Sequence, residues 1–161
     1  MDILNWLTTS GGGKFCFTVL VSMIPVVELR GGIPFGVSLG LGVPAAYLAA
    51  VIGNILPVPF IIVYIRRIFQ WMRRTLPRLD RMVDALERKA HLKGKTISRY
   101  KYLGLAVFVA IPLPGTGAWT GALAAAFLDM PLRRAMPAIT LGVLIAGVLI
   151  SVLTFGIVNI F

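Results

Sequence analysis

The chain is 161 residues long, with 58% hydrophobic residues, 14% charged residues and a formal net charge of +10. Typical soluble domains contain about 25% charged residues, so this composition excludes an ordinary water-soluble domain. Three segments, 31–65, 102–128 and 135–161, contain no Asp, Glu, Lys or Arg. Each is longer than the roughly 20 apolar residues that cross a bilayer core. The sequence therefore predicts an all-α polytopic membrane protein.

The positive charge is concentrated in one region. Twelve of the 16 Lys and Arg residues lie between Arg66 and Lys101, and Arg133 and Arg134 add two more. Lys and Arg accumulate in the cytoplasmic loops of membrane proteins, so we predict that 66–101 faces the cytoplasm. Because loop orientation and contact with anionic lipids account for this charge, no nucleic-acid partner is expected.

The N-terminal segment 1–14 is expected to lie at the membrane interface. Its apolar side chains are Ile3, Leu4, Trp6 and Leu7. A short amphipathic helix of this kind binds the boundary between headgroups and acyl chains without crossing the membrane.

The next segment, 15–43, is apolar but interrupted at IPVVELRGGIP. Its first arm, Phe15–Pro25, would be roughly 16 Å long as a helix, which is about half of the hydrocarbon core. We therefore predict a re-entrant helical hairpin over 15–43, although two short full spans would give the same topology. Residues 43–65 follow as a complete transmembrane helix, and 15–65 forms the first repeat.

The basic segment 66–101 is predicted to be an amphipathic linker on the cytoplasmic leaflet. From Ile68 to Leu86, apolar residues recur at steps of three and four, with Arg and Lys on the other side. This spacing is typical of a helix with one apolar face. The linker would connect the two membrane-embedded halves of the protein.

The C-terminal part, 102–161, repeats the order of features of the first half. A second interrupted segment, 102–130, has the break PLPGTG and predicts another re-entrant hairpin, and 135–160 predicts a second full transmembrane helix. Ionisable residues do not interrupt that last helix, so it is expected to span the membrane completely.

The two halves are also related by position. Aligning Lys14 with Lys101 places Pro25 of the first break on Pro112 of the second. Each half would cross the membrane once, so the two repeats are expected to be inverted relative to one another, with both termini outside. Inverted repeats with broken helices that meet near the midplane are typical of secondary transporters.

The first break carries the charged candidates for a substrate site, Glu28 and Arg30. Ionisable side chains at this depth are costly and usually functional, although a hairpin tip that reaches water would leave them only a structural role. Gly31 and Gly32 precede Pro34, which suits the first turn of a helix. A helix start at this position would attract anions.

The second break contributes no charged residue. It is expected to begin a helix that faces the first helix start. Its substrate-binding candidates are Pro114, Gly115, Thr116, Gly117, Trp119 and Thr120. The hydroxyl groups would donate either to a ligand or to their own helix, and Trp119 would form either a ligand wall or ordinary packing. Asn54, in the first full span, is expected to satisfy hairpin backbone groups rather than to bind ligand.

The sequence gives no sign of an enzyme. It has no His and Cys spacing for a metal site, no phosphate-binding loop and no nucleophile beside a base. We therefore expect no catalytic residues, no metal and no cofactor, with the proton motive force as the energy source. The small residues of 121–126 would allow close helix packing or a homodimer.

At PVVELRGGIPFG and AIPLPGTGAWTGALAA, the sequence resembles the small multidrug export family of bacterial and archaeal membrane proteins. That family resembles the DedA (SNARE-associated, VTT) superfamily, whose members share two opposed re-entrant hairpins and are implicated in moving lipids. The resemblance covers 15–158 and implies a transporter or lipid translocase. DedA proteins place an acidic residue on the first hairpin, where Glu28 matches, and an essential Arg on the second. Here 112–121 lacks Arg, and Arg30 lies on the first hairpin.

Three functions follow as hypotheses. The leading one is proton-coupled translocation of an anionic lipid, such as undecaprenyl phosphate or another polyprenyl phosphate, across the cytoplasmic (inner) membrane. Arg30 and the helix starts would hold the headgroup while Glu28 exchanges protons. The alternative is proton-coupled export of small amphiphilic cationic drugs, with Glu28 binding the cation. The third is a non-transporting membrane assembly or scaffold protein.

Overall fold

The computed structural model describes residues 3–75, 97–113 and 115–160, and within these ranges the chain is all-helical, without strands. The predicted all-α class is confirmed. The helices are α1 (Ile3–Thr9), α2 (Gly11–Ser22), α3 (Glu28–Ser38), α4 (Val43–Ile55), α5 (Val58–Thr75), α7 (Ile97–Ala110), α8 (Ala118–Phe127) and α9 (Leu132–Ile160). The part of the predicted amphipathic linker at 76–96 lies outside the described residues.

Within the described residues, two stretches of helix are long and apolar enough to cross a membrane. The first, Val43–Ile65, combines α4 with the start of α5 and has 23 residues with a mean hydropathy of 2.3. The second, Leu132–Gly156, has 25 residues with a mean hydropathy of 2.5 and belongs to α9. Pro57 and Pro59 lie at the junction of α4 and α5. Because proline has no N–H to donate, the helix is interrupted there.

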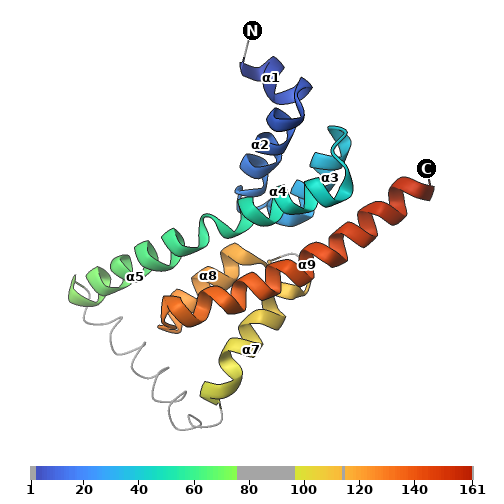
Figure 1. Ribbon diagram of the computed structural model, residues 1–161. Coiled ribbons are helices and arrows are strands. Elements are labelled where there is room, and N and C mark those ends of the chain that lie inside the picture. The colour runs from blue at the N-terminus through green and yellow to red at the C-terminus, as the bar shows by residue number, and fades with distance from the viewer. Residues whose placement is uncertain (1–2, 76–96, 114, 161) are drawn as a thin grey trace.

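The two long apolar helices run in opposite directions. In Figure 1, α4 followed by α5 runs from the centre of the molecule to the left, whereas α9 runs from left to right. The helices α4 and α9 pack against each other at the centre of the molecule. The shorter helices pack in pairs, α2 against α3 and α7 against α8. The first pair contacts α4 and α9, and the second contacts α9 and α5, so each pair touches both long helices.

Small residues let these helices approach closely. A Cβ atom on Gly53 of α4 would lie 2.2 Å from the carbonyl oxygen of Val19 in α2. A Cβ on Gly32 of α3 would lie 1.9 Å from the Ser22 hydroxyl oxygen. Side chains at either position would push the helices apart, so α2, α3 and α4 form one tightly packed unit.

The interior is built from alanines of α4, α8 and α9 together with larger aliphatic residues of the surrounding helices. Ala118, Ala122 and Ala125 are fully buried, as are Ile62 of α5 and Ile139 of α9. The predicted close packing of 121–126 is thus made within the chain.

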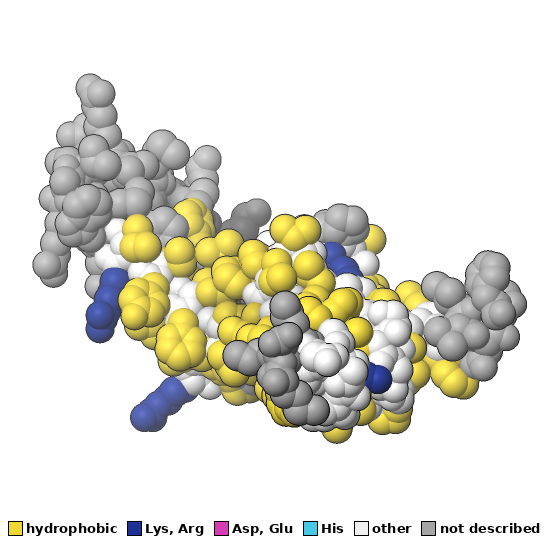
Figure 2. All heavy atoms as spheres, turned by 90° about the horizontal axis from the view of Figure 1, so that it is seen from above, with side chains coloured by type: hydrophobic (Ala, Val, Ile, Leu, Met, Phe, Trp, Pro, Cys, Tyr) yellow, Lys and Arg dark blue, Asp and Glu magenta, His cyan; other side chains and the backbone are white. Residues whose placement is uncertain are grey.

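The outer surface is strongly apolar. Exposed large hydrophobic residues occur on most helices, and Figure 2 shows hydrophobic side chains over much of the described surface with only a few Lys and Arg side chains. Contiguous apolar surface of this extent on a monomer marks contact with a membrane or a partner. It fits the two helices that are long enough to cross a bilayer.

Candidate functional site

The first hairpin reverses at residues 23–27, and α3 begins directly afterwards at Glu28. Glu28 has a positive φ of 47°, a conformation that non-glycine residues rarely adopt. Such backbone conformations cost free energy and cluster at functional sites. The turn therefore holds one particular carboxylate in place at the expense of local stability.

The predicted start of this helix at Ile33 and Pro34 is wrong. Because α3 begins at Glu28, Gly31 lies within the helix, where its N–H donates to the carbonyl oxygen of Val27 at 2.9 Å. The sequence rule that places proline in the first turn is overridden here, and Pro34 lies inside the helix.

The Glu28 carboxylate reaches the second hairpin and accepts a hydrogen bond there. Its Oε1 atom lies 3.1 Å from the backbone nitrogen of Trp119, in the first turn of α8. The first N–H groups of a helix have no partner within the helix, and a negative charge near them is stabilising. Glu28 is only 6% exposed. It therefore acts as a buried cap on a helix that is distant in sequence.

Gly117, immediately before α8, makes room for this carboxylate. Its φ of 146° lies where side chains are disfavoured, and an added Cβ would lie 1.9 Å from Glu28 Oε2. Gly117 supplies no side-chain cap of its own. The glycine is thus required both by its backbone conformation and by the approach of the carboxylate.

Arg30, two residues after Glu28 in α3, contacts the second break at a different point. Its Nη2 atom donates to the Thr116 hydroxyl oxygen at 2.8 Å and also to the Thr116 carbonyl oxygen. The Thr116 hydroxyl lies 2.6 Å from the carbonyl oxygen of Ile111 and 2.7 Å from that of Leu113. Arg30 therefore binds a turn that Thr116 already holds closed, whereas Glu28 binds the helix that follows it.

Trp119 adds a further connection between the hairpins. Its indole Nε1 donates to the carbonyl oxygen of Met23 at 3.1 Å. Met23 forms the C-terminal cap of α2, so this bond joins the end of one hairpin arm to the start of another. Backbone and side chain of Trp119 thus both bind the first hairpin.

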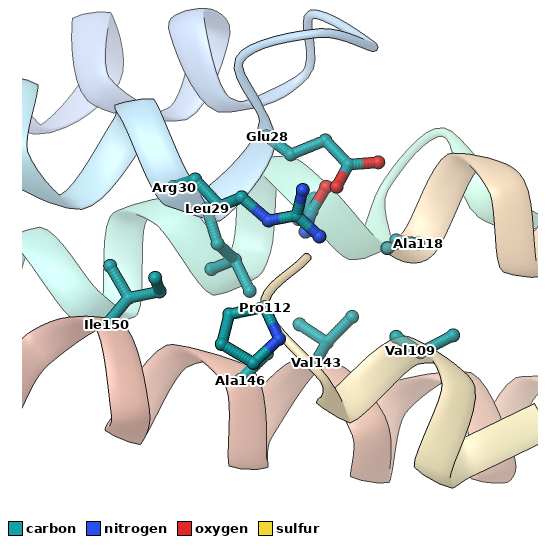
Figure 3. A pocket seen from close by; sticks show the side chains of 11 residues that line it. Glu28, Leu29, Arg30, Val109, Pro112, Ala118, Val143, Ala146 and Ile150 are labelled. Carbon is teal, nitrogen blue, oxygen red and sulfur yellow. The ribbon is translucent and has the colours of Figure 1, made fainter. Parts of the chain in front are cut away.

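A small cavity lies at the meeting point of the hairpins. About 10 Å³ of it is open to the centre of a water molecule. It is lined by Glu28, Leu29, Arg30, Asn54, Val109, Pro112, Gly117, Ala118, Val143, Ala146 and Ile150. Figure 3 shows Glu28 and Arg30 extending from the start of α3, with Pro112, Val143 and Ala146 below them. A volume of this size accommodates about one water molecule and is far too small for a drug or a lipid headgroup.

Not all the candidate residues reach this cavity. Gly31 packs against Val27, and Gly32 against Ser22. Two others, Pro25 and Pro34, are exposed. These four residues belong to the first hairpin but do not line the cavity.

In the second break, Pro112 and Gly117 line the cavity, and Thr116 and Trp119 bind the residues that line it. Gly115 is exposed, with a positive φ of 84°, and Thr120 donates within its own helix to the Gly117 carbonyl oxygen at 3.3 Å. Pro114 lies outside the described residues.

Asn54 differs from its expected role. It was expected to satisfy hairpin backbone groups, yet its Oδ1 atom is buried without a hydrogen-bond partner in the described chain, and the residue lines the cavity. Sequence reasoning also missed the apolar lining from α7 and α9, such as Val109 and Val143. Aliphatic residues within apolar helices give no signal that separates a cavity wall from ordinary packing.

The comparisons with known proteins agree with the resemblance at the two breaks. The family model described as "Putative small multi-drug export protein" matches residues 28–149. The match begins at Glu28, within the first break, and includes the second break, every described lining residue of the cavity except Ile150, and most of α9. No curated protein and no solved structure matched the chain. With its two long apolar helices, the chain is a membrane protein that belongs to the small multidrug export family.

Proposed function

We propose that the protein exports small amphiphilic cations across the cytoplasmic membrane in exchange for protons, and that cation and proton compete for Glu28. The observation that carries this proposal is the position of the Glu28 carboxylate, buried at the point where both hairpins meet. An ionisable group buried in a membrane protein is usually functional. The family description supports export of small molecules.

The arrangement of helices supports an inverted-repeat transporter. In this proposal α2, α3 and the α4–α5 span form the first repeat, and α7, α8 and α9 form the second. The opposite directions of the two long apolar helices (Figure 1) are those that inverted repeats require. The two hairpins are re-entrant, the basic segment 66–101 faces the cytoplasm, and both termini lie outside.

A cationic substrate fits the site better than an anionic one. The groups that would hold an anion are already engaged, because the start of α8 binds Glu28 and the Arg30 guanidinium binds Thr116. A cation needs only the carboxylate. When a cation or a proton neutralises Glu28, the charge that caps α8 is lost, and the contact between the hairpins weakens.

Transport then requires the hairpins to separate, since the cavity between them is about 10 Å³. The hydrogen bonds that join them are those of Glu28 with Trp119, Arg30 with Thr116, and Trp119 with Met23. We infer that these bonds close the site on one side of the membrane and that neutralisation of Glu28 favours its opening. Opening and neutralisation would thereby be coupled.

Translocation of an anionic lipid such as a polyprenyl phosphate is the second candidate. Arg30 favours it, because this guanidinium lines the cavity beside the hairpin tips. Released from Thr116, it would bind a phosphate group in a bidentate manner. In this case Arg30 would hold the substrate and Glu28 would exchange the proton.

The test uses the full chain in vesicles of phosphatidylethanolamine and phosphatidylglycerol, with ethidium as the probe and an acidic vesicle interior. We expect ethidium uptake that stops when nigericin collapses the proton gradient. Glu28→Gln removes the charge that would pair with the cation, so its apparent ethidium affinity should fall by about 30-fold or more. Asp129→Asn is the matched control, since it removes a carboxylate that does not line the cavity.

Equal uptake by Glu28→Gln and the unmodified chain would overturn the proposal, as would an equal loss in Asp129→Asn. If the unmodified chain flips a fluorescent polyprenyl phosphate but does not move ethidium, and Arg30→Ala abolishes the flipping, the second candidate is correct.

A further inference from the structure

The side-chain oxygen of Asn54 is a buried polar atom without a hydrogen-bond partner among the described residues. Asn54 lies near the end of α4 with 1% of its surface exposed. Its Oδ1 atom accepts no hydrogen bond from the described residues. Buried polar atoms are nearly always paired with protein or with ordered water, so each exception needs an explanation.

The explanation lies in the cavity that Asn54 shares with Glu28 and Arg30. Its volume, about 10 Å³, is that of one water molecule rather than that of an organic ligand. A buried water needs two to four polar partners. The Asn54 amide, the Glu28 carboxylate and the Arg30 guanidinium supply them.

The lining favours water over a metal cation. Hard cations are bound by several oxygen ligands, whereas a positively charged guanidinium lines this cavity. The charged groups that line it are Glu28 and Arg30. The helices on the other sides contribute the neutral Asn54 amide and apolar residues such as Val109 and Val143. The described side chains that line the cavity offer a metal ion only the oxygens of Glu28 and Asn54 as ligands, whereas Arg30 would donate to a water molecule.

We propose that one water molecule bound between Asn54 Oδ1 and the Glu28 carboxylate carries protons to and from Glu28. The role in proton transfer rests on the proposed function. The water gives one proton to a Glu28 carboxylate oxygen while it accepts one from a hydronium ion in the solvent. Two O–H bonds break and two form, which leaves a neutral carboxyl group, a water molecule on Asn54 and a water molecule in the solvent. Release of the proton is the reverse of this step.

Asn54 is then a positioning residue that acts through the water. Its amide stays neutral at every physiological pH and can both donate and accept hydrogen bonds. It therefore holds the water whether Glu28 is charged or neutral. An apolar side chain of similar size would exclude the water and leave Glu28 without this route for protons.

A structure of the full chain in lipid, at a resolution that shows ordered water, tests the site itself. We expect density for one water within hydrogen-bonding distance of Asn54 Oδ1 and of a Glu28 carboxylate oxygen. A dry cavity, or a metal ion in it, would overturn the inference. This result does not depend on whether the protein transports ethidium.

The proton-transfer role is tested with Asn54→Leu, with Asn54→Ser as a variant that still holds water, and with Thr18→Val as the control. Thr18 is fully buried, but its hydroxyl donates to the Lys14 carbonyl oxygen at 2.8 Å within α2. In Asn54→Leu, uptake driven by the proton gradient should fall at least about tenfold. Equilibrium binding of ethidium should change by less than about twofold.

Asn54→Ser should recover part of the uptake, and Thr18→Val should match the unmodified chain. Full uptake by Asn54→Leu, or an equal loss in Thr18→Val, would overturn the inference. If the unmodified chain takes up no ethidium, the proposed function fails and proton transfer through this water fails with it. The density then still decides whether the water site exists.

Discussion

The two hairpins contribute different chemistry to the same place. The first, α2–α3, supplies the charged side chains Glu28 and Arg30, whereas the second, α7–α8, supplies backbone groups, a hydroxyl and a glycine. Each hairpin provides hydrogen-bond partners for polar groups of the other. The N-terminus of α8 receives a buried carboxylate, and that carboxylate receives a backbone N–H donor.

This difference shows how a buried charge is accommodated in an apolar protein. The Glu28 carboxylate accepts a hydrogen bond from the start of a distant helix, whereas the Arg30 guanidinium donates its hydrogen bonds to Thr116. A helix start stabilises a carboxylate without adding a second charge that a substrate would have to displace. Changes on the two hairpins should therefore have separable effects.

The largest effect is expected on the second hairpin, from Gly117→Ala. The new Cβ would lie 1.9 Å from Glu28 Oε2, and the residue would have to keep a φ of 146°. Backbone strain of this type costs about 1–3 kcal/mol, and displacement of the carboxylate adds to it. We expect a clear drop in the thermal unfolding temperature and loss of ethidium binding, measured in detergent.

Gly115→Ala is the control for this prediction. Gly115 also has a positive φ, 84°, but a Cβ there would meet nothing within 4 Å. Gly115→Ala should lower the unfolding temperature through backbone strain but should still bind ethidium. If both glycine variants lose ethidium binding equally, the contact between Gly117 and Glu28 does not explain the effect.

A smaller effect is expected on the first hairpin, from Arg30→Ala. This change removes the hydrogen bonds from the guanidinium to the Thr116 hydroxyl and carbonyl oxygens. Hydrogen bonds to charged groups contribute about 1.5–3 kcal/mol, so the unfolding temperature should fall. Thr116→Val removes the hydroxyl contact with Arg30 and the hydroxyl contacts with the Ile111 and Leu113 carbonyl oxygens. It leaves the guanidinium bound to the Thr116 carbonyl oxygen, so it should destabilise less. A larger loss in Thr116→Val would show that Thr116 acts mainly within its own turn.

The smallest effect is expected from Trp119→Phe, which keeps an aromatic ring but removes the donor to Met23. One neutral hydrogen bond contributes about 1 kcal/mol. The unfolding temperature should fall slightly, while the backbone N–H that binds Glu28 is retained. Trp6→Phe, at an exposed position of α1, should change nothing. A loss of ethidium binding in Trp119→Phe would show that the indole itself contacts the substrate.

The sequence was sufficient to predict the helical class and the two long apolar helices. Hydropathy and helix length are local properties, so they can be read without knowing what packs against what. Glu28 and Arg30 were also recognisable, because charged residues are rare in apolar segments.

The contacts between the hairpins could not be predicted. Glu28 and Trp119 are 91 positions apart, and no local pattern indicates that one caps the helix of the other. The same contact explains the wrong prediction for the start of α3, since the rule for proline takes no account of a carboxylate that is held by a distant helix. Asn54 was predicted to bind hairpin backbone groups because the cavity that it lines is formed by residues distant in sequence.

Proton release on ethidium binding tests most directly the claim that proton and cation compete for Glu28. With the purified chain in weakly buffered detergent solution, we expect ethidium binding to release up to one proton per cation at a pH where Glu28 is protonated. Glu28→Gln should release none. Ethidium binding without proton release, or the same release from Glu28→Gln, would contradict the claim.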